Sequence, residues 1–342
     1  MTAADDHREM IQILGELGVA EADVPDDLMD AAAMASDVVL ARDDEYSLRQ
    51  LASEAGQDPD GVAEGFRHLG ITIDDLDEVL FSKDDIVLAR FLVDAVADVF
   101  AEEEGQEILH VVGTALSTIA EASVAGHVQG PERRAADILE NARLNAYIAE
   151  LGLELSHLLG ASFRHHLRQT AIIQRQTQSE THRELVAMSV GFLDLVGFTA
   201  LSQQLDVGEL VDLVKGFESR AHELAHEHRA RIVKLIGDEV MIVAVDPADA
   251  ARFVAGMIDS LDDDSVVPRG GLAYGDLINI HGDYFGPVVN LAARLTDSAV
   301  PGEVLVDDAV SEHVPTEPAG RRMLKGFDDP VRVHSLLREG LT

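Results

Sequence analysis

The hydrophobic pattern of this chain changes near Leu185. Before that residue, apolar positions recur at helical spacing, and glycine and proline mostly stand between the helical stretches. After it, short strand-like runs alternate with longer helical stretches, which predicts an α/β or α+β domain with helices covering a sheet. The predicted strands cover residues 187–196, 231–236, 240–246, 269–280 and 303–306, and the predicted helices cover residues 206–229, 247–260 and 286–298.

Residues 1 to 180 are predicted to be helical, and residues 132–185 form one or two long helices. No glycine or proline occurs between Gly160 and Gly191. The last part of this stretch is polar and has few apolar anchors, which is typical of a helix that bridges domains. We therefore divide the chain into a helical domain, a helical linker and a mixed domain, at residues 1–158, 159–185 and 186–342.

The formal net charge of −37 restricts the possible partners of this chain. Such a surface repels nucleic acid and anionic membranes, so we expect neither as a partner. It also repels nucleotides, so a nucleotide site must concentrate positive charge locally. Lysine is scarce, with four residues in the chain, and cysteine is absent, which excludes disulfides and thiolate metal sites.

The longest apolar stretch, Ile108–Val128, contains His110, Glu121 and His127. We expect a buried helix here rather than a membrane span, because charged and titratable residues are costly in lipid. The N-terminus is acidic and unlike a secretory signal. We therefore expect a cytoplasmic protein.

Two aspartates lie beside strand-like apolar runs. Asp194 lies within VGFLDLVGFT, and Asp238 lies in a Gly-Asp-Glu turn within KLIGDEVMI. A carboxylate beside so much apolar surface is costly unless something pairs with it. Two such carboxylates brought together by folding, with phosphate oxygens completing the shell, are the usual ligands of Mg²⁺.

A third motif, GDYFGPVVNLAAR, covers residues 282–294. Asn290 and Arg294 are four residues apart, which places them on one face of a helix. An amide and a guanidinium on one face can stabilise charge that develops on a ribose oxygen and a phosphate. The alternative is an asparagine at a helix start followed by an exposed arginine.

Four further residues are candidates for binding phosphate groups. Gly197 allows a tight turn in which the N–H groups of Phe198 and Thr199 point at a phosphate. Arg269 opens a predicted strand, and Lys325 lies in RRMLKGF near the C-terminus. Each of the two cations could also be a solvated surface residue.

The order of FLDLVGFT, KLIGDEVMI, RGGLAYG, GDYFGPVVNLAAR and LKGF resembles the catalytic domain of class III nucleotidyl cyclases, over residues 187–337. The N-terminal half resembles the helical regulatory domain of soluble actinobacterial adenylyl cyclases. The resemblance implies an α+β protein, with an all-α regulatory domain before a ferredoxin-like catalytic domain whose central sheet is flanked by helices.

The resemblance also implies roles for individual residues and a reaction. The chain would convert ATP to 3′,5′-cyclic AMP and pyrophosphate at sites shared between the subunits of a head-to-tail homodimer. Asp194 and Asp238 would hold two Mg²⁺ or Mn²⁺ ions, and Lys234 and Asp283 would read adenine. Asn290 and Arg294 would stabilise the transition state, and Arg269 and Lys325 would bind the triphosphate.

Histidines near the linker suggest regulation by pH. They are His157, His165, His166 and His182, and three more, at positions 222, 226 and 228, lie on the first predicted helix of the mixed domain. Histidine changes its charge near neutral pH, so protonation could alter the bridge between the domains. The alternative is that these side chains are solvated and have no regulatory role.

Two competing functions stay open. IGDEVMIV is similar to the turn of diguanylate cyclases, although Ile236 replaces the first glycine of that family's motif, and a GTP-specific cyclase is a related possibility. Residues 46–71 also resemble a helix-turn-helix of a transcription regulator. The few cations of that segment, Arg49, Arg67 and His68, fit DNA binding poorly in so acidic a chain.

Overall fold

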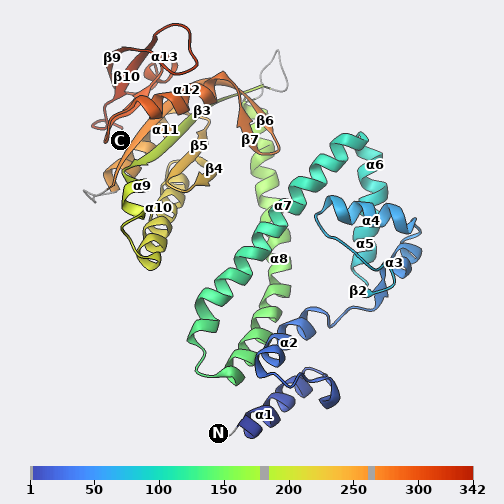
Figure 1. Ribbon diagram of the computed structural model, residues 1–342. Helices are drawn as coiled ribbons and strands as arrows, with labels where there is room; N and C mark the ends of the chain where they lie inside the picture. Colours follow the sequence, from blue (N-terminus) through green and yellow to red (C-terminus); the bar gives the residue numbers. More distant parts are fainter. Residues whose placement is uncertain (1–2, 178–184, 261–265, 342) are drawn as a thin grey trace. The chain divides into compact units, whose positions relative to one another are not determined.

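The computed structural model describes residues 3–177, 185–260 and 266–341 (Figure 1). The chain divides into two compact units, Met1–His165 and His166–Thr342. The division falls within the predicted linker, residues 159–185. Each unit contains its own clusters of buried apolar side chains, so each is described by itself.

The first unit consists mainly of helices, as the sequence pattern predicts. The structure adds one small antiparallel sheet, formed by β1 and β2. The elements of this unit are α1 (Ala3–Glu16), η1 (Glu21–Asp23), α2 (Leu28–Leu40), β1 (Tyr46–Ser47), α3 (Leu48–Ala55), α4 (Pro59–His68), β2 (Val79–Phe81), α5 (Asp85–Arg90), η2 (Phe91–Ala95), α6 (Val96–Val99), α7 (Glu102–His127), η3 (Val128–Glu132) and the first part of α8 (Ile138–Thr177).

The segment that resembles a helix-turn-helix forms β1, α3 and α4. Helix α3 begins with a capping box between Ser47 and Gln50 and ends at Gly56 in the left-handed conformation. The buried faces of α3 and α4 form one apolar cluster with β2, α5 and one residue of α7. Arg49, a cation expected to contact nucleic acid in the alternative function, pairs instead with Asp77 at 3.1 Å.

Helix α7 corrects one sequence expectation. The stretch Ile108–Val128 is helical, but it is not a buried helix within the part of the chain that the structure describes. Only 11% of its most apolar window is buried, and Leu116 and Val124 are among its exposed side chains. By length and composition, Glu103–Glu132 is the single described helix that could cross a membrane. The spacing of apolar residues predicts a helix but does not show whether the rest of the unit covers its apolar face. The expectation of a buried helix was therefore wrong.

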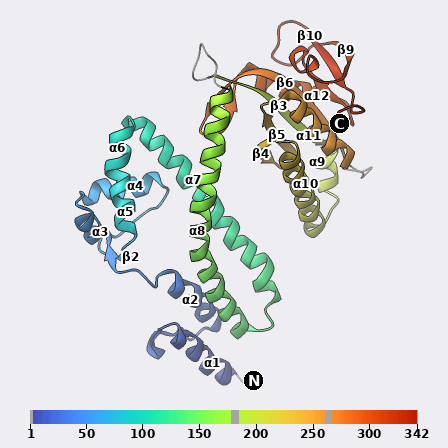
Figure 2. The ribbon, with the colours of Figure 1, turned by 180° about the vertical axis from the view of Figure 1, so that it is seen from behind.

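The second unit contains an eight-stranded mixed sheet, shown from two sides in Figures 1 and 2. The strand order is β4-β5-β3-β6-β8-β10-β9, with β7 paired to β6, and β6 and β8 form the parallel pair among otherwise antiparallel pairs. The elements are β3 (Leu185–Val196), α9 (Phe198–Ser202), α10 (Val207–Glu227), β4 (Arg231–Ile236), β5 (Glu239–Ala244), α11 (Pro247–Ser260), β6 (Val267–Ile280), β7 (Asp283–Phe285), α12 (Pro287–Ser298), β8 (Val304–Val306), α13 (Asp308–Ser311), β9 (Thr316–Arg322) and β10 (Val331–Leu336).

The five strands and three helices predicted for this unit are confirmed. The sequence pattern missed β7, β9 and β10 and the short helix α13. Strand β9 has the sequence TEPAGRR, which contains proline, glycine and charged residues that rarely indicate a strand. It forms because β10 provides a partner edge for it, which is a tertiary effect.

Helices cover both faces of the sheet. Leu193 and Leu195 of β3 lie in one apolar cluster with residues of α10 and α11. The alternate residues Val190 and Phe192 lie in a second cluster with residues of α12. Successive side chains of a strand point to opposite faces, so Asp194 shares the α12 face with Phe192.

Glycine allows α12 to lie directly on the sheet. A Cβ atom at Gly271 would lie 2.4 Å from the backbone nitrogen of Thr296 and 2.5 Å from the carbonyl oxygen of Ala292. The buried hydroxyl of Thr296 donates hydrogen bonds to the carbonyl oxygens of Ala292, at 3.0 Å, and Phe192, at 3.3 Å. These contacts fix the helix that carries Asn290 against β3 and β6.

We expect Gly271→Ala to destabilise the second unit by about 2–3 kcal/mol, because helix backbone and strand backbone would have to separate. Urea unfolding followed by circular dichroism measures this change. Gly216→Ala on α10 is the matched control, since a Cβ atom there meets nothing within 4 Å. The control should be neutral or stabilise by up to ~1 kcal/mol. Equal unfolding midpoints for Gly271→Ala and the wild type would contradict this packing.

Candidate active site

The two predicted metal-binding aspartates lie on adjacent segments at one end of the sheet. Asp194 is the third residue from the end of β3, and Asp238 lies in the turn between β4 and β5, after Gly237 with φ +63°. The N–H group of Leu195 donates to the carbonyl oxygen of Asp238 at 3.3 Å, which ties the turn to β3. The fold therefore brings together two residues that are 44 positions apart in the sequence.

The pKa values of the neighbouring acids show crowding of negative charge. Burial raises the pKa of Asp238, and the charge of Asp194 raises it further, against a backbone hydrogen bond that lowers it. Burial also raises the pKa of Glu239, with Asp194, Asp297 and Asp238 adding to the effect and Lys234 opposing it. Glu239 is directly opposite Asp194 in the register of β3 and β5.

These residues fit a divalent cation of the Mg²⁺ type. The half-buried carboxylates of Asp194 and Asp238 are hard ligands, and a dication would relieve the repulsion that helps to raise the pKa of Asp238. Among the described residues, no group of three or more His, Asp or Glu side chains is arranged around a common metal position. Asp194 and Asp238 therefore need oxygen ligands from outside the chain, such as phosphate or water, to complete a coordination shell.

Arg269 contacts one of these two carboxylates. It lies opposite Asp194 in the register of β3 and β6, and its Nε and Nη2 atoms donate to Oδ2 of Asp194 at 3.0 and 2.8 Å. The sequence predicted a ligand of a triphosphate at this position, and the structure places the guanidinium on Asp194.

The predicted adenine-reading residues form an ion pair. Nζ of Lys234 donates to Oδ2 of Asp283 at 2.7 Å, and Oδ1 of Asp283 accepts from the backbone N–H of Tyr284 at 2.8 Å. Burial is the largest single effect on Asp283 and raises its pKa, but the hydrogen bonds from Lys234 and the Tyr284 N–H and the charges of Lys234 and Arg231 together lower the pKa overall. Asp283 is the first residue of the short strand β7.

Asn290 and Arg294 both lie on α12, as the i, i+4 spacing predicts. Asn290 is exposed in the first turn, and Nη1 of Arg294 donates to Oδ2 of Asp297 at 2.7 Å. The acid three residues later therefore holds the guanidinium near its own helix. The structure joins the two residues on one helix and leaves their polar groups accessible to a ligand.

The remaining predicted phosphate ligands are not brought into contact with the aspartates. Lys325 is exposed in the turn after the buried Leu324, between β9 and β10. Phe198 and Thr199 begin the five-residue helix α9 after Gly197, whose φ of +92° provides the predicted turn. Phe198 packs against the apolar cluster of α10 and α11, so this residue also has a structural role.

The linker histidines are solvent-facing where the structure describes them. The side chain of His157 is 84% exposed and lies 3.8 Å from Glu154, and His165 and His166 are exposed on α8. His182 lies outside the described residues. Of the three histidines on α10 or next to it, His222 and His226 are exposed and the third, which caps the helix, is half-buried.

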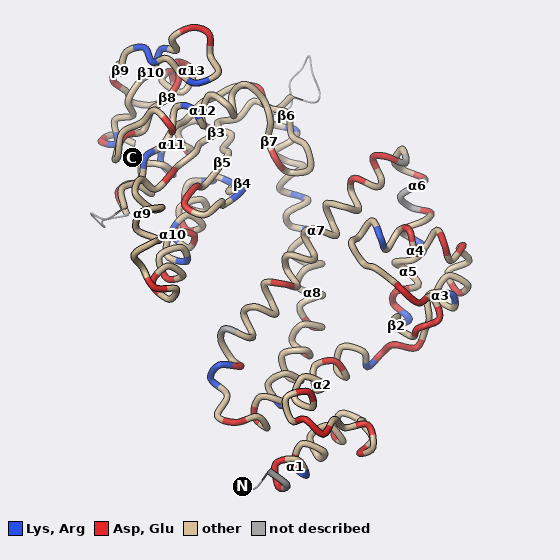
Figure 3. The backbone as a smooth tube through the Cα atoms, in the orientation of Figure 1, with Lys and Arg blue, Asp and Glu red and all other residues tan. Residues whose placement is uncertain are grey.

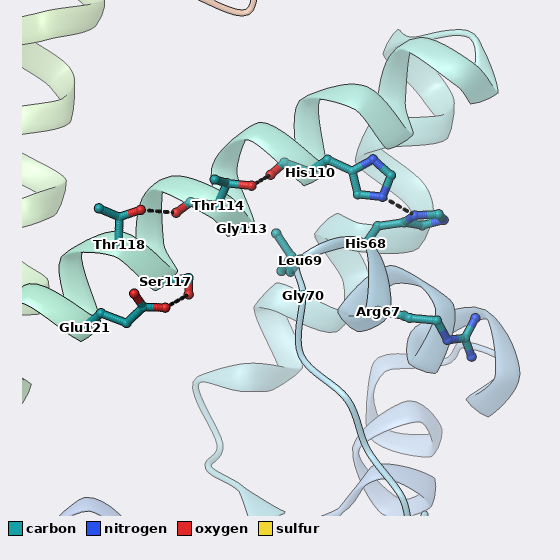
Figure 4. Close-up of a pocket in the computed structure, with 10 residues that line it drawn as sticks. All are labelled: Arg67, His68, Leu69, Gly70, His110, Gly113, Thr114, Ser117, Thr118 and Glu121. Carbon is teal, nitrogen blue, oxygen red and sulfur yellow. Dashed lines mark hydrogen bonds between the residues drawn. The ribbon is translucent and has the colours of Figure 1, made fainter. Parts of the chain in front are cut away.

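Sequence reasoning missed a histidine pair that joins two helices of the first unit. Nδ1 of His68, the last residue of α4, lies 3.1 Å from Nε2 of His110 on α7, and the pair lines a cavity of about 430 Å³ (Figure 4). Glu64 lies 3.8 Å from the other nitrogen of His68. A second such contact joins His127 to Asn145 at 2.7 Å. No spacing rule could have paired side chains that are 42 and 18 positions apart.

Charge is distributed unevenly in this acidic chain. Figure 3 shows acidic residues along both units and fewer basic ones. Within the second unit, Lys234, Arg269 and Arg294 each bind a carboxylate near the candidate site. Each of these three basic residues therefore has an acidic partner within the same chain.

Comparison with known proteins gives consistent matches. Residues 180–260 match the model of the adenylate and guanylate cyclase catalytic domain. An uncharacterized protein of Mycobacterium tuberculosis is 34% identical over 301 residues, which cover 85% of this chain and 79% of that protein. An adenylate cyclase of Streptomyces coelicolor is 30% identical over 81% of this chain and 74% of its own length. A pH-sensitive adenylate cyclase of M. tuberculosis is 27% identical over 98% of this chain and 89% of its own length.

The ion pair of Lys234 and Asp283 has a defined pH dependence. The pKa of Asp283 is lowered below its ordinary value of 3.8, so its stabilisation is present above that value and is lost as the pH falls through the folded-state pKa. Because the pair is partly exposed, we expect Asp283→Asn to lower the free energy of unfolding by about 0.5 kcal/mol near neutral pH. This difference from the wild type should be constant from about pH 5 to 8 and become smaller below about pH 4.

Urea midpoints of the wild type and Asp283→Asn across pH measure this deficit, with Asp328→Asn, an exposed loop residue, as the control. A deficit that grows as the pH falls would contradict the assigned direction of the pKa shift.

Proposed function

Because this chain belongs to the class III adenylyl cyclases, we propose that it converts ATP to 3′,5′-cyclic AMP and pyrophosphate at sites shared by two copies of the chain. The observation that carries the proposal is the convergence of Asp194 and Asp238 at one end of the sheet, where Leu195 binds the Asp238 carbonyl. Relatives named adenylate cyclase support the choice of ATP.

Asp194 and Asp238 would hold two Mg²⁺ or Mn²⁺ ions. When bound, these ions supply Lewis-acid stabilisation to the attacking ribose oxygen and to the leaving phosphates. The ribose 3′-oxygen attacks the α-phosphorus, the bond to pyrophosphate breaks, and the 3′-hydroxyl proton leaves to solvent. No side chain is assigned as a general base.

The side chains of α12 would stabilise the transition state. Asn290 orients the ribose, and Arg294 stabilises charge on the α-phosphate after exchanging Asp297 for the ligand. Arg269 and Lys325 bind the triphosphate, and the N–H groups of Phe198 and Thr199 approach its phosphates. Positioning and charge stabilisation thus account for the contribution of the chain.

Lys234 and Asp283 would read the purine. The lysine can donate to N1 of adenine, and the carboxylate can accept from its N6 amino group. Guanine presents the opposite polarity at both atoms, so the pair favours ATP over GTP. The bond between the two side chains, 2.7 Å long, holds both in place before the nucleotide arrives.

Two copies are needed because the proposed head-to-tail dimer takes the aspartates of each site from one copy and Lys234, Asn290 and Arg294 from the other. We expect Asp194→Asn and Arg294→Ala each to reduce turnover at least about 100-fold when present alone. Mixing the two variants should restore roughly a quarter of wild-type activity, since half of the dimers are mixed and each of these has one intact site.

The measurement is chromatography of the products formed from ATP or GTP with Mn²⁺. Cyclic AMP from ATP supports the proposal, whereas a cyclic dinucleotide from GTP would favour the diguanylate alternative. Mixing the variants without recovery would rule out the shared site, and full activity of Asp194→Asn would rule out the metal assignment.

We also propose that the first unit regulates turnover and that pH is one signal. A pH-sensitive relative that matches 98% of this chain supports this, as do the histidine contacts between helices of the first unit, His68 with His110 and His127 with Asn145. Histidine is the side chain whose charge changes near neutral pH, so the contact of His68 with His110 is a candidate for this role. The linker histidines, His157, His165, His166 and His182, are a second set of candidates.

We expect the full chain and residues 166–342 alone to differ in their activity profiles between about pH 5.5 and 8. Turnover of both forms at saturating Mn²⁺–ATP measures the difference. His110→Gln in the full chain should shift its profile toward that of the fragment, while Tyr147→Phe, an exposed residue of α8, should not. Profiles of the same shape would exclude regulation by pH through the first unit.

We propose that the enzyme acts in the cytoplasm, where ATP is available. His110, Glu121 and His127 on α7, and the hydrogen bond of His127 to Asn145, support contact of this helix with water and protein rather than lipid. The acidic surface supports a protein without nucleic acid partners.

A further inference from the structure

Arg269 makes four hydrogen bonds that connect the metal-binding strand to the end of α12. Its Nε and Nη2 atoms donate to Oδ2 of Asp194, and its Nη1 atom donates to the carbonyl oxygens of Asp297 at 2.9 Å and Ala299 at 3.5 Å. The side chains of Arg269 and Asp194 are each about one quarter exposed. Charge-assisted hydrogen bonds of this kind, here two to a single carboxylate oxygen, are among the stronger polar contacts in proteins.

The sheet register explains why a cation is needed at this position. Asp194 lies between Glu239 on β5 and Arg269 on β6, and all three side chains emerge on the same face. Asp238 lies next to them in the turn before Glu239. Three carboxylates close together are unfavourable unless positive charge is near, and within the described residues Arg269 is the cation bonded to Asp194.

We propose that Arg269 is a resident counter-ion that occupies Asp194 until the cations and the nucleotide arrive, and that it then transfers to the triphosphate. This inference rests on the proposed function and deepens it. Arg269 and a divalent cation compete for the same carboxylate, so cations bind weakly alone. A nucleotide brings phosphate oxygens that accept the displaced guanidinium, and therefore cations and ATP bind cooperatively.

The bonds to α12 keep the guanidinium near both partners during this exchange. Nη1 is held by the carbonyl oxygens of Asp297 and Ala299, while Nε and Nη2 are the atoms that leave Asp194. The guanidinium stays hydrogen-bonded through the exchange, because phosphate oxygens accept the bonds that Oδ2 of Asp194 gives up. An arginine suits this role because its planar group binds carboxylate and phosphate with the same geometry.

Arg322 provides a matched control for the contact with α12. Its Nη1 atom donates to the carbonyl oxygen of Ser298 at 2.6 Å, and Nη2 lies 3.4 Å from Glu303. It therefore binds the same helix end as Arg269 but has no bond to Asp194. A change caused by loosening the end of α12 should occur in both Arg269→Gln and Arg322→Gln, whereas a change caused by freeing Asp194 should occur only in the first.

The test is Mn²⁺ binding to the full chain without nucleotide, measured by electron paramagnetic resonance of free Mn²⁺. We expect Arg269→Gln to bind Mn²⁺ roughly tenfold more tightly than the wild type, because a competing positive charge is removed. Arg322→Gln should bind like the wild type. With ATP present, the cooperativity between Mn²⁺ and ATP should fall in Arg269→Gln, and KM for ATP should rise.

Equal or weaker Mn²⁺ binding by Arg269→Gln would overturn the proposal, because it would mean that the arginine positions Asp194 rather than competes for it. Arg269→Lys gives a second measurement if the glutamine variant folds poorly, and its Mn²⁺ affinity should fall between the other two. Asp194→Asn distinguishes failure of the metal site from failure of the counter-ion role. If this variant binds Mn²⁺ as the wild type does, the metal site itself is wrong. If it loses Mn²⁺ binding while Arg269→Gln binds Mn²⁺ no more tightly than the wild type, only the counter-ion role is rejected.

Discussion

Crowded negative charge at one end of a sheet is the constraint on which the candidate site depends. The register of three antiparallel strands places Glu239, Asp194 and Arg269 side by side, and the hairpin turn adds Asp238. An apolar sheet would not hold these acids without compensation. In the proposed function, the same arrangement binds dications and, through Arg269, phosphate.

The close packing of α12 on the sheet connects Glu239, Asp194 and Arg269 to the helix whose side chains are proposed to stabilise the transition state. Gly271 lets the helix backbone touch β6, and the hydroxyl of Thr296 bonds to β3. Arg269 then reaches both Asp194 and the end of the helix that carries Arg294. In the proposed dimer Asp194 and Arg294 serve different sites, so Arg269 contacts elements that belong to both sites.

The first unit contains a long apolar helix, α7, that is mostly exposed within the described part of the unit. The contacts of His68 with His110 and of His127 with Asn145 join it to other segments. A few polar contacts of this kind hold a helix less firmly than apolar packing does, which suits a unit that is proposed to regulate rather than to catalyse.

The sequence by itself determined the change from helical to mixed structure, the main strands and helices of the second unit, and the residue types of the site, because periodicity and turn residues act locally. The i, i+4 relation of Asn290 and Arg294 is local as well. Only the tertiary structure decided that the polar strand β9 forms, that α7 stays exposed, and that Arg269 binds Asp194. These depend on strand register and on which surfaces meet, and residues 75 positions apart carry no local signal of their pairing.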